Sequence, residues 1–253
     1  MKTLFLAWQS PDSGSWFPIG RLTFNGKEYQ FNYTNGVLEA KLKCGFQPLP
    51  SFPDFNNVYT SQKLFALFSN RVMARSRPEY PEFVQWLNIP EHEHDPIALL
   101  ARSGGKRATD KFEVFPCPEP DENGRYCIHF FADGLRYLSK SAIERIHRLQ
   151  VGELLYLAHE FKNPRPSRLL LCTKDHWIVG YCQRYLVDDI FEIISQHPEL
   201  VRVEVDRLNQ PPTPLQFRLL CKMTADCQQG FRPFQGPMYQ PVSSDVVAAS
   251  AIG

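Results

Sequence analysis

The sequence predicts a β-rich α+β protein made of two modules, and three observations support this fold class. Apolar and polar residues alternate in short segments, such as Tyr29 to Tyr33 and Val201 to Asp206, as they do in half-buried strands. The chain contains 21 prolines and 14 glycines, which indicates many short elements joined by turns. Hydrophobic residues make up 43% of the 253 positions, enough for one large core or two smaller ones.

Residues 1–108 are predicted to form a small mixed subdomain in which strands are followed by helices. Asn25-Gly26 separates two alternating segments and is the strongest short signal for a β-hairpin. Three helices are expected after this sheet, and they begin near Ser61, Pro81 and Asp95.

Residues 109–235 are predicted to form a β-barrel with two helices. One helix is expected to begin at Ser139 and the other to run from Leu186 to Ile194. The expected strands are 112–115, 125–132, 154–158, 169–173, 177–181, 201–206 and 215–223, with the first two joined through Asn123-Gly124. This order is typical of a closed barrel. Residues 236–253 are small and polar, which predicts a disordered tail.

Bulk properties limit the function classes and the compartment. The formal net charge of +1 excludes proteins that bind nucleic acid through overall basicity, so any such binding needs a local patch. The seven cysteines form no Cys-x-x-Cys pair, which indicates buried thiols in a reduced, cytoplasmic protein. The apolar run at residues 1–8 is too short for a signal peptide, and we expect no membrane span.

Two segments of the second module carry a family resemblance: Gly134 to Leu138 (Gly-Leu-Arg-Tyr-Leu) and Val179 to Leu186 (Val-Gly-Tyr-Cys-Gln-Arg-Tyr-Leu), with Asn163-Pro164 between them. This order resembles the HIRAN domain, a module of DNA-remodelling proteins and of free-standing bacterial proteins. The resemblance implies an OB-like barrel that grips single-stranded DNA at an end. The strand contacts that it implies are Arg136, Tyr137, Tyr181 and Arg184.

The residues themselves allow a second interpretation at each of these positions. A tyrosine ring can stack on a base while an arginine holds the phosphate, but a tyrosine packed on the barrel beside a solvated arginine is the ordinary alternative for Arg136-Tyr137. Tyr181 can equally end a core strand, with Arg184 at the start of a helix.

A basic loop precedes the second segment and is a further candidate for phosphate contact. It contains Lys162, Arg165 and Arg168 with no acidic residue before Asp175, although a solvated loop is the alternative. The HIRAN pattern has an aromatic residue and an aspartate after Asn-Pro, whereas this chain has Arg165 and Pro166. Recognition of a strand end is therefore not implied for this chain.

Residues 1–108 resemble the small N-terminal subdomain of HipA-type toxin kinases, which carries no catalytic residues. The matching segments are 19–22, 29–34, 49–53 and 64–71. In some systems this subdomain is a separate regulatory protein, so the resemblance implies an alternative function as a regulatory subunit or antitoxin that binds a HipA-type serine kinase. Arg71, Arg75 and Arg77 form a basic cluster that could dock an acidic partner, DNA included, with scattered surface charge as the alternative.

Catalytic and metal-binding signatures are missing from the sequence. It contains no nucleophile elbow, H-E-x-x-H, Walker loop or kinase motif, and the pairs His92-x-His94 and Cys127-x-His129 lack a second zinc pair. A hydrolase or nuclease is the least favoured alternative, because no acidic cluster has metal-site spacing. We therefore expect a non-catalytic nucleic-acid-binding accessory protein without cofactor or metal, with DNA handling or phage defence as its setting.

Overall fold

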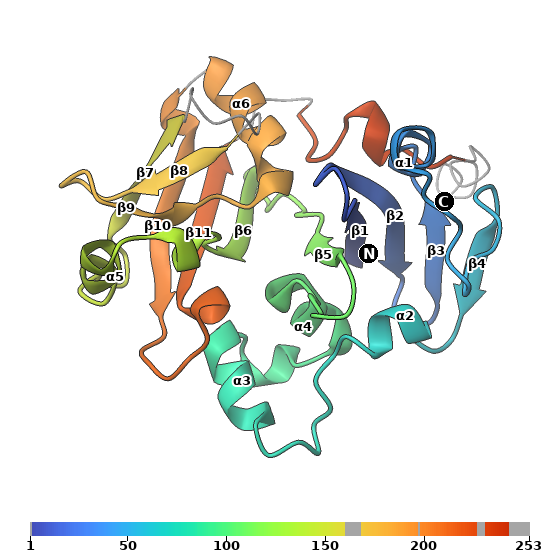
Figure 1. The fold of residues 1–253 in the computed structure, drawn as a ribbon, viewed down its shortest axis with the longest axis horizontal. Helices are drawn as coiled ribbons and strands as arrows, with labels where there is room; N and C mark the ends of the chain where they lie inside the picture. Colours follow the sequence, from blue (N-terminus) through green and yellow to red (C-terminus); the bar gives the residue numbers. More distant parts are fainter. Residues whose placement is uncertain (1, 160–167, 197, 227–230, 243–253) are drawn as a thin grey trace. The chain divides into compact units, whose positions relative to one another are not determined.

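The computed structural model describes residues 2–159, 168–196, 198–226 and 231–242, which form two compact units (Figure 1). Unit 1 takes its described residues from 2–77, 92–117 and 232–242. Unit 2 takes them from 78–91 and 118–226, together with Phe231. The described residues contain six α-helices and eleven strands, so the predicted β-rich α+β class is confirmed.

Unit 1 is built on a five-stranded antiparallel sheet in the order β4-β3-β2-β1-β5. The strands are β1 (Lys2–Gln9), β2 (Trp16–Phe24), β3 (Tyr29–Tyr33), β4 (Val58–Ser61) and β5 (Phe112–Pro116). The helices are α1 (Gly36–Cys44), α2 (Ala66–Ser69) and α4 (Pro96–Ser103). Helix α1 packs against β2, and α4 packs against β5 and β1.

Local signals explain several of these elements. The predicted hairpin at Asn25 is confirmed, and the Asn25 side chain accepts hydrogen bonds from the backbone N–H groups of Lys27 and Glu28, each at 2.9 Å. Asp95 caps α4 as predicted, because its carboxylate accepts from the backbone N–H of Ala98 at 2.9 Å. Helix α3 (Tyr80–Leu87) is also confirmed, although it belongs to unit 2.

The helix expected from Ser61 is wrong at its start. Ser61 ends β4 and pairs with Tyr29, and its hydroxyl accepts from the backbone N–H of Lys63 in a turn. The strand pairing therefore outweighs the capping preference of this serine, and α2 begins only at Ala66.

Unit 2 is built on a curled six-stranded sheet, a half-barrel in the order β6-β11-β10-β7-β8-β9 (Figure 1). The strands are β6 (Arg125–Phe131), β7 (Leu154–His159), β8 (Leu169–Cys172), β9 (Ile178–Tyr181), β10 (Val201–Leu208) and β11 (Leu219–Asp226). Besides α3, its helices are α5 (Lys140–Ile146) and α6 (Val187–Gln196). Both helices predicted for this module are therefore confirmed, with Ser139 capping α5 through the N–H of Ala142.

The edges of this sheet meet at one residue pair. Asp133, two residues beyond β6, pairs with Tyr181 at the end of β9, and each backbone N–H donates to the other residue's carbonyl at 2.9 Å. The closed barrel that we expected is thus a half-barrel whose edges are joined at one point in the described residues. An OB-like relationship stays a prediction.

The boundary between the modules differs from the simple division after residue 108. The two strands that Asn123-Gly124 joins are present, but β5 pairs with β1 in unit 1, whereas β6 pairs with β11 in unit 2. The predicted disordered tail is wrong over 236–242. Pro237–Tyr239 form a 3₁₀ turn, and the N–H of Val242 donates to the carbonyl of Tyr33 at 3.1 Å. Residues 243–253 lie outside the described residues.

None of the helices in the described residues combines the length and apolar character needed to span a bilayer.

A buried ion pair ties together distant parts of unit 1. The Arg71 side chain is 2% exposed and donates from both terminal nitrogens to Asp110, at 3.1 and 2.6 Å, and to the Gly105 carbonyl at 3.0 Å. Burial alone would raise the pKa of Asp110, but the hydrogen bonds from Arg71 and from the Phe112 N–H hold that pKa below its ordinary value. Arg71 therefore has a structural role.

We predict that Arg71→Ala lowers the free energy of unfolding of unit 1 by about 3 kcal/mol, because it leaves the Asp110 carboxylate partly buried without its partner. Arg77→Ala is the matched control, since Arg77 is exposed and its removal should change stability by less than about 0.5 kcal/mol. Urea unfolding followed by circular dichroism measures both variants. Equal stability of the two variants would contradict the structural role.

Candidate nucleic-acid interface

The candidate interface lies where the two edges of the unit 2 sheet meet. The Asp133–Tyr181 backbone pair joins the chain after β6 to the end of β9. A second contact lies beside it, because the Gln183 side-chain amide donates to the Phe131 carbonyl at 2.6 Å. Two segments that are about fifty residues apart in sequence are therefore held side by side by four residues.

Gly134 sets the distance between these segments. Its φ of +77° is a left-handed conformation that glycine adopts without strain, and a Cβ at this position would lie 2.6 Å from the Tyr181 ring. The Gly134 carbonyl also accepts from the N–H of Tyr137 at 2.9 Å, which closes the 3₁₀ turn Leu135–Tyr137. The missing side chain thus lets the Tyr181 ring lie against the turn that carries Arg136 and Tyr137.

Each segment presents a tyrosine with an arginine stacked on it, and for Tyr181 this arginine is Arg168, which directly precedes β8. The Arg136 guanidinium carbon lies 4.6 Å from the Tyr137 ring centroid, and the Arg168 guanidinium carbon lies 4.8 Å from the Tyr181 ring centroid. Tyr137 is 69% exposed, so little of its ring is used for packing. Within the described residues, neither arginine is ion-paired with a carboxylate.

The predicted site residues are brought together only in part. Arg136, Tyr137 and Tyr181 lie on the two joined segments, and Arg184 is half-buried in the 3₁₀ turn Arg184–Leu186 that follows Tyr181. Lys162 and Arg165 lie outside the described residues.

From the sequence, Arg168 was expected only as part of the basic loop and not as a neighbour of Tyr181. The hairpin register could have revealed it, because Leu170 pairs with Tyr181 and Arg168 lies two residues before Leu170 on the neighbouring strand end. Residues two apart share one face of a strand, so Arg168 and Tyr181 are diagonal neighbours.

The residues predicted to bind a protein partner have three different environments. Arg71 is buried in the ion pair with Asp110, and its guanidinium is not available at the surface. Arg75 is exposed but donates to the His94 carbonyl, and Arg77 is exposed. The kinase-docking role of unit 1 stays a prediction.

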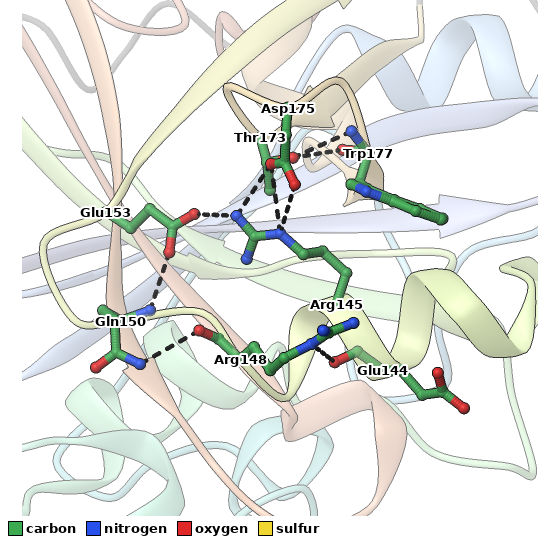
Figure 2. A network of polar contacts seen from close by, with 8 residues as sticks. All are labelled: Glu144, Arg145, Arg148, Gln150, Glu153, Thr173, Asp175 and Trp177. Atoms are coloured by element: carbon green, nitrogen blue, oxygen red, sulfur yellow. Dashed lines mark hydrogen bonds and ion pairs between the residues drawn. The ribbon is translucent and has the colours of Figure 1, made fainter.

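A polar network at the other end of the β8–β9 hairpin holds its turn against α5 (Figure 2). Arg145 of α5 donates to Glu153 at 2.6 Å and to both carboxylate oxygens of Asp175, with the closest contacts at 3.0 Å. The hydrogen bond from Arg145, followed by one from Thr173, holds the pKa of Asp175 well below its ordinary value. This network fixes the hairpin whose last residue is Tyr181.

Two cysteines of this unit are buried thiols. Cys182 and Cys221 are fully enclosed, and burial raises the pKa of the Cys182 thiol to about 12, so it stays protonated at neutral pH. In the part of the chain that the structure describes, no group of three or more His, Cys, Asp and Glu side chains is placed to hold a metal ion.

We predict that Gly134→Ala destabilises unit 2 more than Gly124→Ala does. Both glycines have φ +77°, so alanine has the same backbone cost of about 1–2 kcal/mol at each. A Cβ at Gly124 meets nothing within 4 Å, whereas at Gly134 it meets the Tyr181 ring. Thermal unfolding of the two variants measures the difference. An equal loss of stability in the two variants would show that the close packing of Tyr181 on Gly134 does not exclude a side chain at position 134.

We predict that the stabilising effect of Asp175 depends on pH. Because its folded pKa is lowered, its contribution is present above the unfolded pKa of about 3.9 and is lost as pH falls through the folded value. Asp175→Asn should therefore lower the urea midpoint at pH 7, and the gap from the unmodified protein should narrow below about pH 4.

Glu144→Gln is the control for this series, since the Glu144 carboxylate on α5 points away from Arg145 (Figure 2). Its urea midpoint should follow that of the unmodified protein at each pH. A gap between Asp175→Asn and the unmodified protein that stays constant with pH would contradict the ion pair.

Comparison with protein-family models, with curated proteins and with solved structures found no match to this chain.

Proposed function

We propose that unit 2 binds single-stranded nucleic acid, DNA in the first instance, as a non-catalytic accessory protein. The observation that carries the proposal is the pair of arginine-stacked tyrosines on the two joined segments, Arg136 with Tyr137 and Arg168 with Tyr181. The proposal shares Arg136, Tyr137 and Tyr181 with the contacts that the HIRAN resemblance implies, whereas Arg168 comes from the basic loop and Arg184 is not used.

The chemistry of these groups suits an unpaired strand. Exposed aromatic rings stack on bases whatever their sequence, at roughly 1–3 kcal/mol per base. A guanidinium beside the ring can donate two hydrogen bonds to a phosphate. Since the chain has a net charge of only +1, this local cluster must supply the affinity.

The exposure of Tyr137 favours this function over simple packing. A tyrosine that only supports the core would be largely buried, but Tyr137 is 69% exposed and lies under an arginine without a carboxylate partner in the described residues. Tyr181 is half-buried against Gly134, which would hold its ring in a fixed orientation.

We predict that the protein binds fluorescein-labelled dT12 at low salt and that the affinity falls steeply as salt rises. Tyr137→Ala should weaken binding about tenfold through the lost stacking. Arg136→Gln should reduce the slope of log affinity against log salt by about 0.7, the value for one phosphate contact on a single strand. Fluorescence anisotropy measures both quantities.

Lys27→Gln is the control for this experiment, because Lys27 is exposed in the β2–β3 turn of unit 1 and should leave both quantities unchanged. No binding of dT12 at low salt would overturn the proposed function. Equal effects of Lys27→Gln and Arg136→Gln would show that binding follows overall charge and not the proposed interface.

A further inference from the structure

The outer side of the half-barrel presents an apolar surface on three neighbouring strands. The register places Tyr156 of β7 opposite Cys172 of β8, and Cys172 opposite Ile178 of β9. Directly opposite residues lie on the same face of an antiparallel sheet. Tyr156 is 49% exposed and Ile178 is 39% exposed. The alternate residues Leu155, Leu171 and Val179 are buried, so they form the inner face.

The same face extends to Tyr181 at the candidate interface. Ala158 pairs with Leu170, and Leu170 pairs with Tyr181. This row lies two residues from the Tyr156–Cys172–Ile178 row on β7 and β8, and three residues from it on β9, where the register shifts. We name this surface the β7–β9 face and define it by Leu154, Tyr156, Leu170, Cys172, Ile178 and Tyr181. It leads without interruption from Tyr156 to the tyrosine that Arg168 covers.

Charged residues bound the β7–β9 face on the side of β10. Leu154 pairs with Glu204, which contacts Lys222 at 3.4 Å and Arg202 at 3.2 Å. The side beyond Leu154 therefore carries two cations around one carboxylate. At the opposite side, Arg168 has no carboxylate partner among the described residues. Positive charge thus lies on both sides of this apolar surface.

We propose that Tyr156 is a second base-stacking position, and that a single strand bound at Tyr137 and Tyr181 continues across the β7–β9 face. This inference rests on the proposed function and extends it to a longer track. Exposed aromatic rings near a guanidinium that has no carboxylate partner among the described residues suit a polynucleotide, which has flat apolar bases and a charged backbone. A purely apolar partner would leave the Arg168 charge without a counterpart.

The spacing of the rings sets the length of strand required. Tyr156 and Tyr181 are two strands and two residues apart, which places their Cα atoms roughly 12 Å from each other. A single strand advances about 3.4 Å per nucleotide when its bases are stacked. About four to five nucleotides are therefore needed to reach both rings in that form, and a stacked dinucleotide cannot reach both.

The test compares Tyr156→Leu with Tyr156→Phe by anisotropy on labelled dT12. Leucine keeps an apolar side chain in the strand but removes the ring, so binding should weaken roughly tenfold. Phenylalanine keeps the ring and should bind like the unmodified protein. Leu42→Ala, which removes an exposed apolar side chain from α1 of unit 1 and outside the β7–β9 face, is the control and should also bind normally. Unlabelled dT2 should displace labelled dT12 only weakly, and to the same extent from the unmodified protein and from Tyr156→Leu.

The outcomes separate this inference from the proposed function. Tight dT12 binding by both the unmodified protein and Tyr156→Leu would overturn the longer track while leaving the proposed interface intact. Absence of binding by the unmodified protein would overturn both. Analytical ultracentrifugation tests whether a second copy of the chain occupies the β7–β9 face instead. Self-association that is lost in Tyr156→Leu, while the affinity for dT12 is unchanged, would show this and would overturn the longer track.

Discussion

The backbone pair between Asp133 and Tyr181 is the constraint on which the unit 2 surface depends. A six-stranded sheet with two free edges could have a wide range of curvatures, but this pair fixes the distance between the chain after β6 and the end of β9. Only a residue without a side chain fits next to the joined edges, because the Tyr181 ring occupies the position of a Cβ at Gly134. The same closure brings the turn with Arg136 and Tyr137 next to Tyr181. Fold and candidate interface therefore have one structural origin.

The Arg145 network supports this closure from the opposite end of the β8–β9 hairpin. Its ion pairs join α5 to the turn that holds Asp175, and the strand that follows ends at Tyr181. Partly exposed ion pairs add little stability when they are isolated. One arginine that binds two carboxylates, each with further hydrogen bonds, is better ordered than a single pair. We infer that the network's main contribution is to the orientation of the hairpin.

Local signals in the sequence predicted local structure well, and long-range pairings less well. Asn25 and Ser139 specify a turn and a helix start through bonds to backbone groups within three residues, so they could be predicted from sequence. The partner of Arg71 lies 39 residues away, and β5 pairs with a strand at the start of the chain. No local pattern contains that information. Part of the interface was predictable because its residues lie in two short segments, whereas the stacking of Arg168 on Tyr181 depends on strand register.

The arrangement of charge and aromatic surface also argues for selection between nucleic acid forms. A duplex presents its phosphates to a protein but hides the faces of its bases, so binding to it depends on many basic contacts. This chain has a net charge of +1 and offers two arginine–tyrosine stacks instead of a long basic stripe. Rings such as Tyr137 gain contact only with bases that are already unstacked. Under the proposed function, we therefore expect a single strand to bind better than a duplex, because charge is scarce and the Tyr137 ring is exposed.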